Sequence, residues 1–319
     1  MLKRFIPILV IMFMTTIFIT QHTQAVSEWD EAVTVYGAAL ENDQNLQTQT
    51  AEVLGVEDND IISYVYREDS MRYLNQDYAN NILKSSIRIQ QRNEGHGLDL
   101  TINEEMGRIT QITPQMYQNA LITSGITDAV VVIGAAEDVT GESALAGIYK
   151  AFAEQGEEVN EEYTQNAQQE LNVINNITQQ NINVDGFSQE QLNKMITEIK
   201  INIIDEGGDL SEEQIRNIVN DQMERNGLDG ILTETQVNNI INIVIQIQNS
   251  GIFQSEEANR LLDSSRDLVN QITSSDAFDQ AKEQAAQIGK EIQESGVWQN
   301  FLNALQDFID LILNFFRSN

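Results

Sequence analysis

Several residue types are absent from this sequence or nearly so. It contains no cysteine, two prolines and two histidines in 319 residues. The lack of cysteine excludes disulfides, zinc–thiolate sites and a thiol nucleophile. His22 lies in an N-terminal segment with the features of an export signal. His96 would then be the single histidine of the mature chain, which excludes clusters of histidine ligands. Such a chain must be stabilised by its hydrophobic core, and its length is sufficient for two domains.

Basic residues are also scarce. The chain has 18 lysines and arginines against 49 aspartates and glutamates. Removing the first 25 residues takes away Lys3 and Arg4 but no acid, so the mature chain has a net charge of 16 − 49 = −33. This charge repels the phosphates of nucleic acids and the headgroups of anionic lipids. Nucleic acid is therefore excluded as a partner.

The first 25 residues predict a signal peptide. Lys3 and Arg4 form a positive start, and the apolar run Phe5–Ile19 follows. The polar stretch Gln21–Ala25 then places small side chains at the positions that a signal peptidase inspects. A membrane anchor needs about 20 apolar residues, more than this run provides. We expect cleavage between Ala25 and Val26, and a protein that is secreted or associated with the cell envelope.

The fold class expected from the pattern is α+β or α/β, with a small layered α/β domain over residues 26–156. Leu98–Ile102 alternates apolar and polar residues, which predicts a half-buried strand. Val130–Ile133 is continuously apolar, which predicts a central strand buried on both faces. β-branched and aromatic residues indicate three further strands. These are Val33–Tyr36, Ile61–Tyr66 and Ile87–Ile89.

Helices are expected between these strands. Thr113 is a capping residue and Pro114 suits the first helical position, so a helix is predicted from there to about Ser124. A second helix is predicted to open at Thr140 and to stop at Gly156.

Residues 157–251 are expected to form an all-helical bundle domain. Three segments repeat one capping signal, a serine or threonine followed three residues later by glutamine. In that arrangement the two side chains satisfy each other's backbone donors at the start of a helix. The capping residues are Ser188, Ser211 and Thr233. Glycines between the segments supply the stops, so three successive short helices are predicted.

Residues 252–319 are expected to form a helical tail. Its apolar residues from Phe278 to Ile292 have the 3-4 spacing of a seam between helices. The last segment, Val297–Phe316, predicts an amphipathic helix. We expect it to bind a protein partner or a second copy of the chain, and its candidate interaction residues are Trp298, Phe301, Leu305, Phe308, Ile312 and Phe315. A membrane surface is the less favoured alternative, because the polar face carries Asp307 and Asp310.

No pattern in the sequence predicts a catalytic, cofactor or metal site. His96 stands between two glycines, and no nucleophile elbow accompanies it. The stretch around Gly230 has the middle of a calcium loop, but Arg225 and Gln236 stand where the strongest ligands are needed. The strand exit at Gly134 lacks the lysine and the spaced glycines of a phosphate loop. Paired catalytic carboxylates have no sequence spacing of their own, so a carboxylate-based enzyme stays open.

Several stretches together resemble one family, the YpuA-like secreted proteins of Gram-positive bacteria, a family of unknown function. The resemblance covers residues 33–251 and is carried by four pieces in a fixed order. These are Val33–Leu40, Tyr117–Ile126, Asp128–Val132 and Thr140–Gly147. The resemblance implies an exported protein. It implies no catalytic residues, and Ala39 stands where members have an acid.

These observations favour an exported, non-enzymatic protein of the cell envelope or medium that acts by protein–protein contact and needs no cofactor. The alternatives are a carboxylate-based hydrolase acting on wall polymers, and peripheral membrane association through the C-terminal helix. The hydrolase requires a cleft with two facing, partly buried acids of raised pKa.

Overall fold

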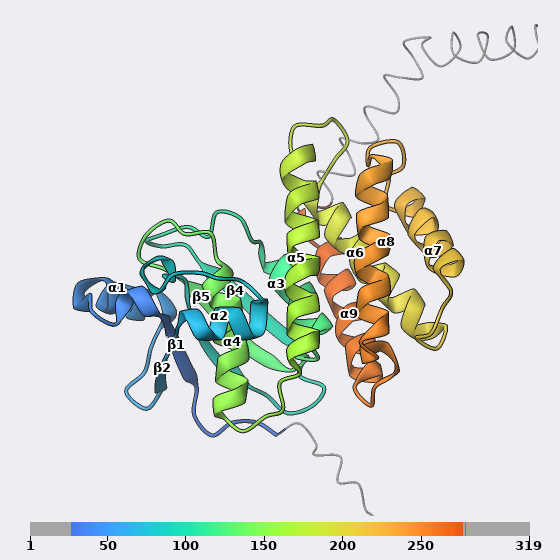
Figure 1. Ribbon diagram of the computed structural model, residues 1–319. Coiled ribbons are helices and arrows are strands. Elements are labelled where there is room, and N and C mark those ends of the chain that lie inside the picture. The colour runs from blue at the N-terminus through green and yellow to red at the C-terminus, as the bar shows by residue number, and fades with distance from the viewer. Residues whose placement is uncertain (1–26, 277, 279–319) are drawn as a thin grey trace, which may run out of the picture.

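The computed structural model describes residues 27–276 and 278 (Figure 1). A five-stranded mixed sheet occupies one side of the body, and a group of helices stands beside it (Figure 1). The mixed α/β class expected from the sequence is therefore confirmed. The signal segment with Ala25 and Val26 lies outside the described residues, as does the terminal helix with its six interaction residues.

All five predicted strands are present. They are β1 (Val33–Gly37), β2 (Ile61–Val65), β3 (Ser86–Gln91), β4 (Leu98–Asn103) and β5 (Ala129–Gly134). The order across the sheet is β2-β1-β3-β5-β4. The pairs β1–β2 and β4–β5 are parallel, and β3 runs antiparallel to both of its neighbours. The strands β2 and β4 therefore form the two edges.

Helices cover the two faces of the sheet unequally. On one face, α4 (Glu142–Glu154) packs over β1, β2 and β3. On the other face, α1 (Gln44–Leu54) lies over β3 and β5. It comes so close to Gly134 that a Cβ there would overlap Val53, which is why this position is a glycine. The predicted central position of β5 is confirmed by the sheet order. Because α1 covers only part of its face, Val130 and Val132 stay half-buried, so the prediction of burial on both faces holds for one face only.

The helix α3 (Pro114–Thr123) lies between the sheet and the remaining helices. The Thr113 hydroxyl accepts a hydrogen bond from the Met116 N–H at 3.4 Å, so the predicted cap is confirmed. Every residue from Met116 to Thr123 is buried. One side of α3 contacts β4, and the others contact α5 (Glu161–Asn181), α6 (Gln189–Asp205) and α9 (Ala258–Thr273).

The two helices α7 (Glu212–Arg225) and α8 (Glu234–Asn249) complete the helical part. At Ser211 and Thr233 the predicted capping boxes are complete, with both reciprocal hydrogen bonds formed. At Ser188 only the first half forms: the Gln191 N–H donates to the hydroxyl at 3.3 Å, but the Gln191 side chain does not accept from the Ser188 N–H. The same hydroxyl donates to Glu190 Oε2 at 2.7 Å. The shorter elements are α2 (Arg67–Leu74) and the 3-10 turns η1 (Ala38–Leu40), η2 (Asn80–Ile82) and η3 (Ile252–Gln254).

One hydrophobic core runs through both parts of the described chain. It extends without a break from the sheet residues, such as Val35 and Val131, through α3 to Ile199 and Ile272 in the helices. The α/β part and the helical part therefore share α3 as a common buried layer.

The helix α4 begins later than predicted. Its N-cap is Gly141, with a φ of 117° that favours glycine, and its first residue is Glu142. A Cβ at Gly141 would collide with Tyr117, whose hydroxyl donates to the Gly141 carbonyl at 2.7 Å. The preceding chain is held instead by the bridge between Ile109 and Val139, so Thr140 ends an extended segment and does not cap the helix.

Candidate functional site

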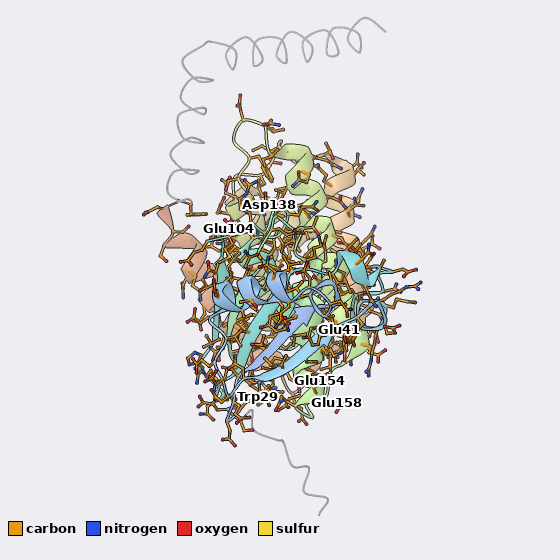
Figure 2. All side chains as sticks on the ribbon, turned by 90° about the vertical axis from the view of Figure 1, so that its left-hand side faces the viewer. Trp29, Glu41, Glu104, Asp138, Glu154 and Glu158 are labelled. Atoms are coloured by element: carbon orange, nitrogen blue, oxygen red, sulfur yellow. The ribbon has the colours of Figure 1, made fainter. Side chains whose placement is uncertain are left out.

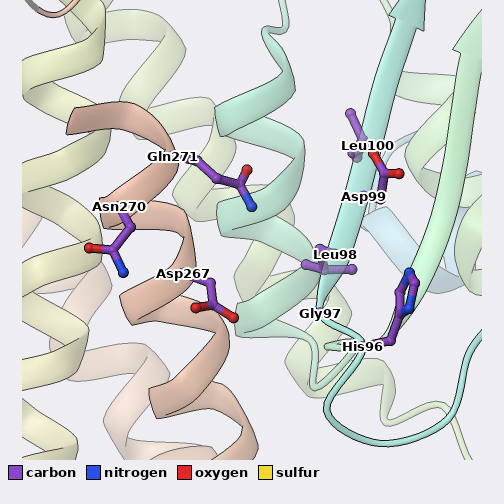
Figure 3. Close-up of a pocket in the computed structure, with 8 residues that line it drawn as sticks. All are labelled: His96, Gly97, Leu98, Asp99, Leu100, Asp267, Asn270 and Gln271. Carbon is purple, nitrogen blue, oxygen red and sulfur yellow. The ribbon is translucent and has the colours of Figure 1, made fainter. Parts of the chain in front are cut away.

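A groove of about 500 Å³ lies between the edge strand β4 and α9 (Figure 3). One wall is the β4 segment with Asp99, and the other wall is the α9 surface with Asp267 and Asn270. The complete lining is His96, Gly97, Leu98, Asp99, Leu100, Asp267, Asn270 and Gln271. The groove thus joins the α/β part of the body to the helical part.

The strand β4 offers main-chain hydrogen-bonding groups to this groove. The Ala129 N–H donates to the Gly97 carbonyl at 3.1 Å, so Gly97 faces β5. Backbone groups alternate in direction along a strand, so Asp99 and Thr101 also face β5, whereas Leu98, Leu100 and Ile102 face outward. Among the described residues, β4 pairs with β5 alone. The outward Leu98 carbonyl accepts from Gln118 Nε2 at 3.4 Å, so Leu100 and Ile102 carry the outward main-chain groups with which another strand could pair.

Carboxamide groups line the side of the groove next to this edge. The buried Gln118 of α3 donates from Nε2 to Gln271 Oε1 at 2.9 Å and lies 3.4 Å from the Leu98 carbonyl. Asn270 is exposed one position before Gln271 on α9. Carboxamides carry both donors and acceptors, so they can bind the main chain of a polypeptide without selecting its side chains.

The formal charges lining the groove are negative. Asp99 and Asp267 are exposed on opposite walls, and His96 stands exposed at one end, in the turn between β3 and β4 (Figure 3). Acidic side chains also lie over the sheet side of the body, including Glu41, Glu104 and Asp138 (Figure 2). This charge favours a ligand with positive groups and disfavours an anionic one.

The other positions considered in the sequence show no assembled chemistry. His96 is held by a backbone turn in which its N–H donates to the Asn93 carbonyl at 3.1 Å. Gly230 lies in the turn between α7 and α8 with a φ of 74°. Within residues 27–276 and 278, no group of three potential acidic or histidine ligands is close enough to hold a metal ion.

Arginine partners lower the pKa of several carboxyl groups. Burial alone would raise the pKa of Asp60, but hydrogen bonds from Arg88 and Thr34 outweigh it and lower the pKa. Hydrogen bonds from Arg67 and Arg108 lower the pKa of Asp77 and Asp138, respectively. A general acid needs a raised pKa, so these three carboxyl groups are unsuited to that role.

A second polar site is fully buried where α3, α5 and α6 meet. Lys200 Nζ lies 2.6 Å from Glu170 Oε1, and both side chains are only 2% exposed. Lys200 also donates to the Asn119 carbonyl at 3.0 Å, to Asn119 Oδ1 at 3.2 Å and to Thr123 Oγ1 at 2.7 Å. The Thr123 hydroxyl in turn donates to Glu170 Oε2. Among the described ion pairs, this is the one with both partners buried.

Sequence reasoning missed this buried cluster. Its members are scattered over 82 positions, and Lys200 stands in a helix whose neighbours give no sign of a partner. One signal was available, since Lys200 lies among Ile196, Ile199 and Ile203 on the apolar stripe of α6. A lysine at such a position needs a buried counter-charge, although its identity cannot be read from the sequence.

Comparison with known families identifies the chain. The model of a family described as protein of unknown function, DUF1002, matches residues 36–265. The chain belongs to the DUF1002 family. The matched range includes the end of β1, the strands β2 to β5 and the helices α1 to α8, and with them the buried cluster around Lys200. It ends within α9, two residues before Asp267.

A relative supports the same assignment. The chain is 28% identical over 254 residues to the uncharacterized protein YpuA of Bacillus subtilis (strain 168), which covers 77% of this chain and 81% of the relative. The resemblance to YpuA-like proteins is thereby confirmed. No solved structure matches this DUF1002 chain. The helices of its described part include none that is long and apolar enough to cross a membrane.

Proposed function

We propose that this DUF1002 protein is exported and acts outside the cytoplasm, in the medium or at the cell envelope, as a non-enzymatic protein that binds other proteins. The groove along the free edge of β4 is the observation that carries this proposal. It brings the outward main-chain groups of Leu100, the carboxamides of Asn270 and Gln271, and negative charge together in one groove.

The export proposal is supported by the position at which the folded body begins. Trp29 is buried, with its ring centroid 4.9 Å from that of Phe152, and its backbone N–H donates to the Gln91 carbonyl at 3.2 Å. Glu28 forms an ion pair with Arg92. Figure 2 shows Trp29 at the lower end of the body. The predicted cut between Ala25 and Val26 would therefore keep Glu28, Trp29 and their contacts in the mature protein.

The contact proposal commits to a partner with an extended, positively charged segment. A strand added beside β4 would pair with the outward groups of Leu100 and Ile102, and such pairing supplies affinity without side-chain selection. Selectivity would come from Asp99 and Asp267, which lie on opposite walls of the groove. Positive side chains on the added strand would meet these carboxylates.

The C-terminal helix remains a proposed second contact. Its six apolar interaction residues would be worth roughly 1.5–3 kcal/mol each when buried. We favour a protein partner or a second copy of the chain over a lipid surface, because the polar face of the helix bears Asp307 and Asp310. Neither the lipid alternative nor the hydrolase alternative gains a specific supporting observation from the described residues.

A designed peptide tests the groove. We suggest a labelled ten-residue peptide of alternating lysine and valine, with binding to the purified mature protein followed by fluorescence polarisation. We expect Asp267→Lys to weaken binding several-fold, because it replaces an attraction by a repulsion. The matched control is Asp263→Lys on the same helix, whose 79% exposed side chain does not line the groove. This control should bind the peptide nearly as the unmodified protein does.

Main-chain pairing is tested by methylating alternate amide nitrogens of the same peptide. The charge is unchanged, but the donors that face β4 are removed, so binding should be lost. Equal binding of the methylated and unmethylated peptides would overturn strand addition. Equal binding by Asp267→Lys and Asp263→Lys would overturn the assignment to this groove.

A further inference from the structure

We propose that Lys200 and Asn119 form an intramolecular isopeptide bond, with Glu170 as the proton carrier. This covalent cross-link would join α6 to α3 in the buried centre of the molecule. It is independent of the groove and of the proposed binding function.

The geometry places the reacting groups in contact. Lys200 Nζ lies 3.2 Å from Asn119 Oδ1, so a small side-chain rotation brings the nitrogen to the carbon bonded to that oxygen. Glu170 Oε1 is 2.6 Å from the same nitrogen. The three side chains come from α3, α5 and α6, and these helices are packed together by the core that surrounds them. The contact is therefore fixed by the fold before any reaction occurs.

The surroundings favour an uncharged amine. Burial lowers the pKa of Lys200, although the nearby Glu170 carboxylate opposes this effect. A proton can leave the ammonium along an existing chain of hydrogen bonds, from Lys200 Nζ to the Thr123 hydroxyl and from this hydroxyl to Glu170 Oε2. The result is a neutral amine with a free lone pair beside a neutral carboxylic acid.

The reaction balances without any outside reagent. The amine lone pair forms a bond to Asn119 Cγ, and the carbonyl π electrons move to Oδ1. The Thr197 hydroxyl lies 3.0 Å from Oδ1 and 2.7 Å from the Asn193 carbonyl. Turned toward Oδ1, its single hydrogen would stabilise the charge that develops there. Glu170, whose Oε1 lies 2.6 Å from the attacking nitrogen, takes a proton from that nitrogen. Asn119 Nδ2 donates to the Asn193 carbonyl at 3.4 Å and to Asn193 Oδ1 at 3.3 Å, so the carboxamide must turn away from Asn193 for Glu170 to pass its own proton to Nδ2. The bond from Cγ to Nδ2 then breaks, the carbonyl re-forms, and ammonia leaves.

The product also removes an electrostatic cost. The ammonium and carboxylate become an amide, a neutral carboxylic acid and free ammonia, so no buried ion pair remains. Burial away from water raises the free energy of each charge, so replacing the ion pair by neutral groups lowers the free energy of the folded protein. Nearby water would compete by hydrolysing the amide, and the full burial of Asn119, Glu170 and Lys200 excludes it.

Intact-mass spectrometry of the purified mature protein tests the proposal. The expected mass is that of the sequence minus one molecule of ammonia. A tryptic digest should contain a branched peptide in which the Lys200 side chain is joined to the Asn119 side chain. This peptide is required, because ring closure at Asn226-Gly227 would also release ammonia.

Two variants and a control complete the test. Lys200→Met and Asn119→Ala should each restore the full mass expected for their own sequences. Lys150→Met is the matched control, since Lys150 pairs with Asp69 on another part of the fold and should leave the ammonia loss unchanged. If a variant fails to fold, the intact mass and the tryptic peptides of the unmodified protein still test the proposal. A full sequence mass, or an ammonia loss without the branched peptide, would overturn the proposal.

Discussion

Replacing Asp60 with asparagine tests how much a buried ion pair on the sheet contributes to the free energy of unfolding. The Asp60 side chain is fully buried, and Arg88, 22% exposed, donates to it from Nε at 2.7 Å and from Nη2 at 3.0 Å. The Thr34 hydroxyl adds a third hydrogen bond at 2.9 Å. The change Asp60→Asn keeps the shape of the side chain but removes its charge, and its amide nitrogen would face donors of Arg88.

The expected loss follows from this burial. Breaking a buried pair by removing one partner costs about 3–5 kcal/mol when the remaining charge has no access to water. Arg88 retains some access, so we expect the free energy of unfolding to fall by about 2–3 kcal/mol. For a protein of this size that corresponds to a decrease in Tm of roughly 3–5 °C.

Thermal unfolding followed by circular dichroism, repeated across pH, provides the assay. The pKa of Asp60 is lowered in the folded state, so its stabilising contribution is present above the unfolded pKa of about 4. That contribution is lost as pH falls through the lower, folded pKa. The difference in Tm between the two proteins should therefore be constant from pH 7 to about 5 and shrink below about 4.

The control for this prediction is Asp77→Asn. Asp77 also pairs with an arginine, Arg67, but its side chain is 61% exposed, so no measurable change in Tm is expected. The reasoning would be refuted if Asp60→Asn unfolded at the same temperature as the unmodified protein. A difference in Tm at pH 3 as large as at pH 7 would refute the electrostatic origin of the effect.

Four further outcomes are expected. Ser188→Ala, Ser211→Ala and Thr233→Ala should each cost about 1 kcal/mol of stability in chemical denaturation, because a helix N–H loses its acceptor, and unchanged midpoints in all three would contradict the capping assignment. Added chelator should leave Tm unchanged, whereas a decrease would reveal a bound metal. N-terminal sequencing of protein from the medium should begin at Val26, and an intact Met1 on a membrane-bound product would contradict export. In a Trp29→Phe background, Trp298 should emit at short wavelength without lipid, whereas a blue shift that requires anionic vesicles would favour the membrane alternative.

The sequence predicted best those elements whose signals are local. Leu98–Ile102 alternates because one side of β4 packs on the core, and the Thr113-Pro114 start of α3 is a matter of neighbouring residues. The complete capping boxes at Ser211 and Thr233 were predictable for the same reason, because each involves residues only three positions apart. At Ser188 the prediction was half right, because the hydroxyl accepts from the Gln191 N–H but the Gln191 side chain does not accept from the Ser188 N–H.

Features that depend on distant residues were not predictable in the same way. The helix α1 is rich in glutamine and threonine and buries only Thr50, Val53 and Leu54, so its apolar period is weak. The groove exists because α9 lies beside β4, more than 150 positions away in the chain. No spacing rule connects these segments, nor does one connect Lys200 with Glu170 and Asn119.

The position of α3 in the shared core has a consequence for the order in which the chain can fold during synthesis. One side of α3 can pack on β4 soon after both have been made. Its other sides await α5, α6 and α9, and α9 begins 258 − 123 = 135 residues after α3 ends. Contacts between such distant segments are slow to form, because long loops must close first. The growing chain therefore carries an apolar helix without its final cover until most of the polypeptide has been made, and the core around α3 is completed only when α9 packs against it.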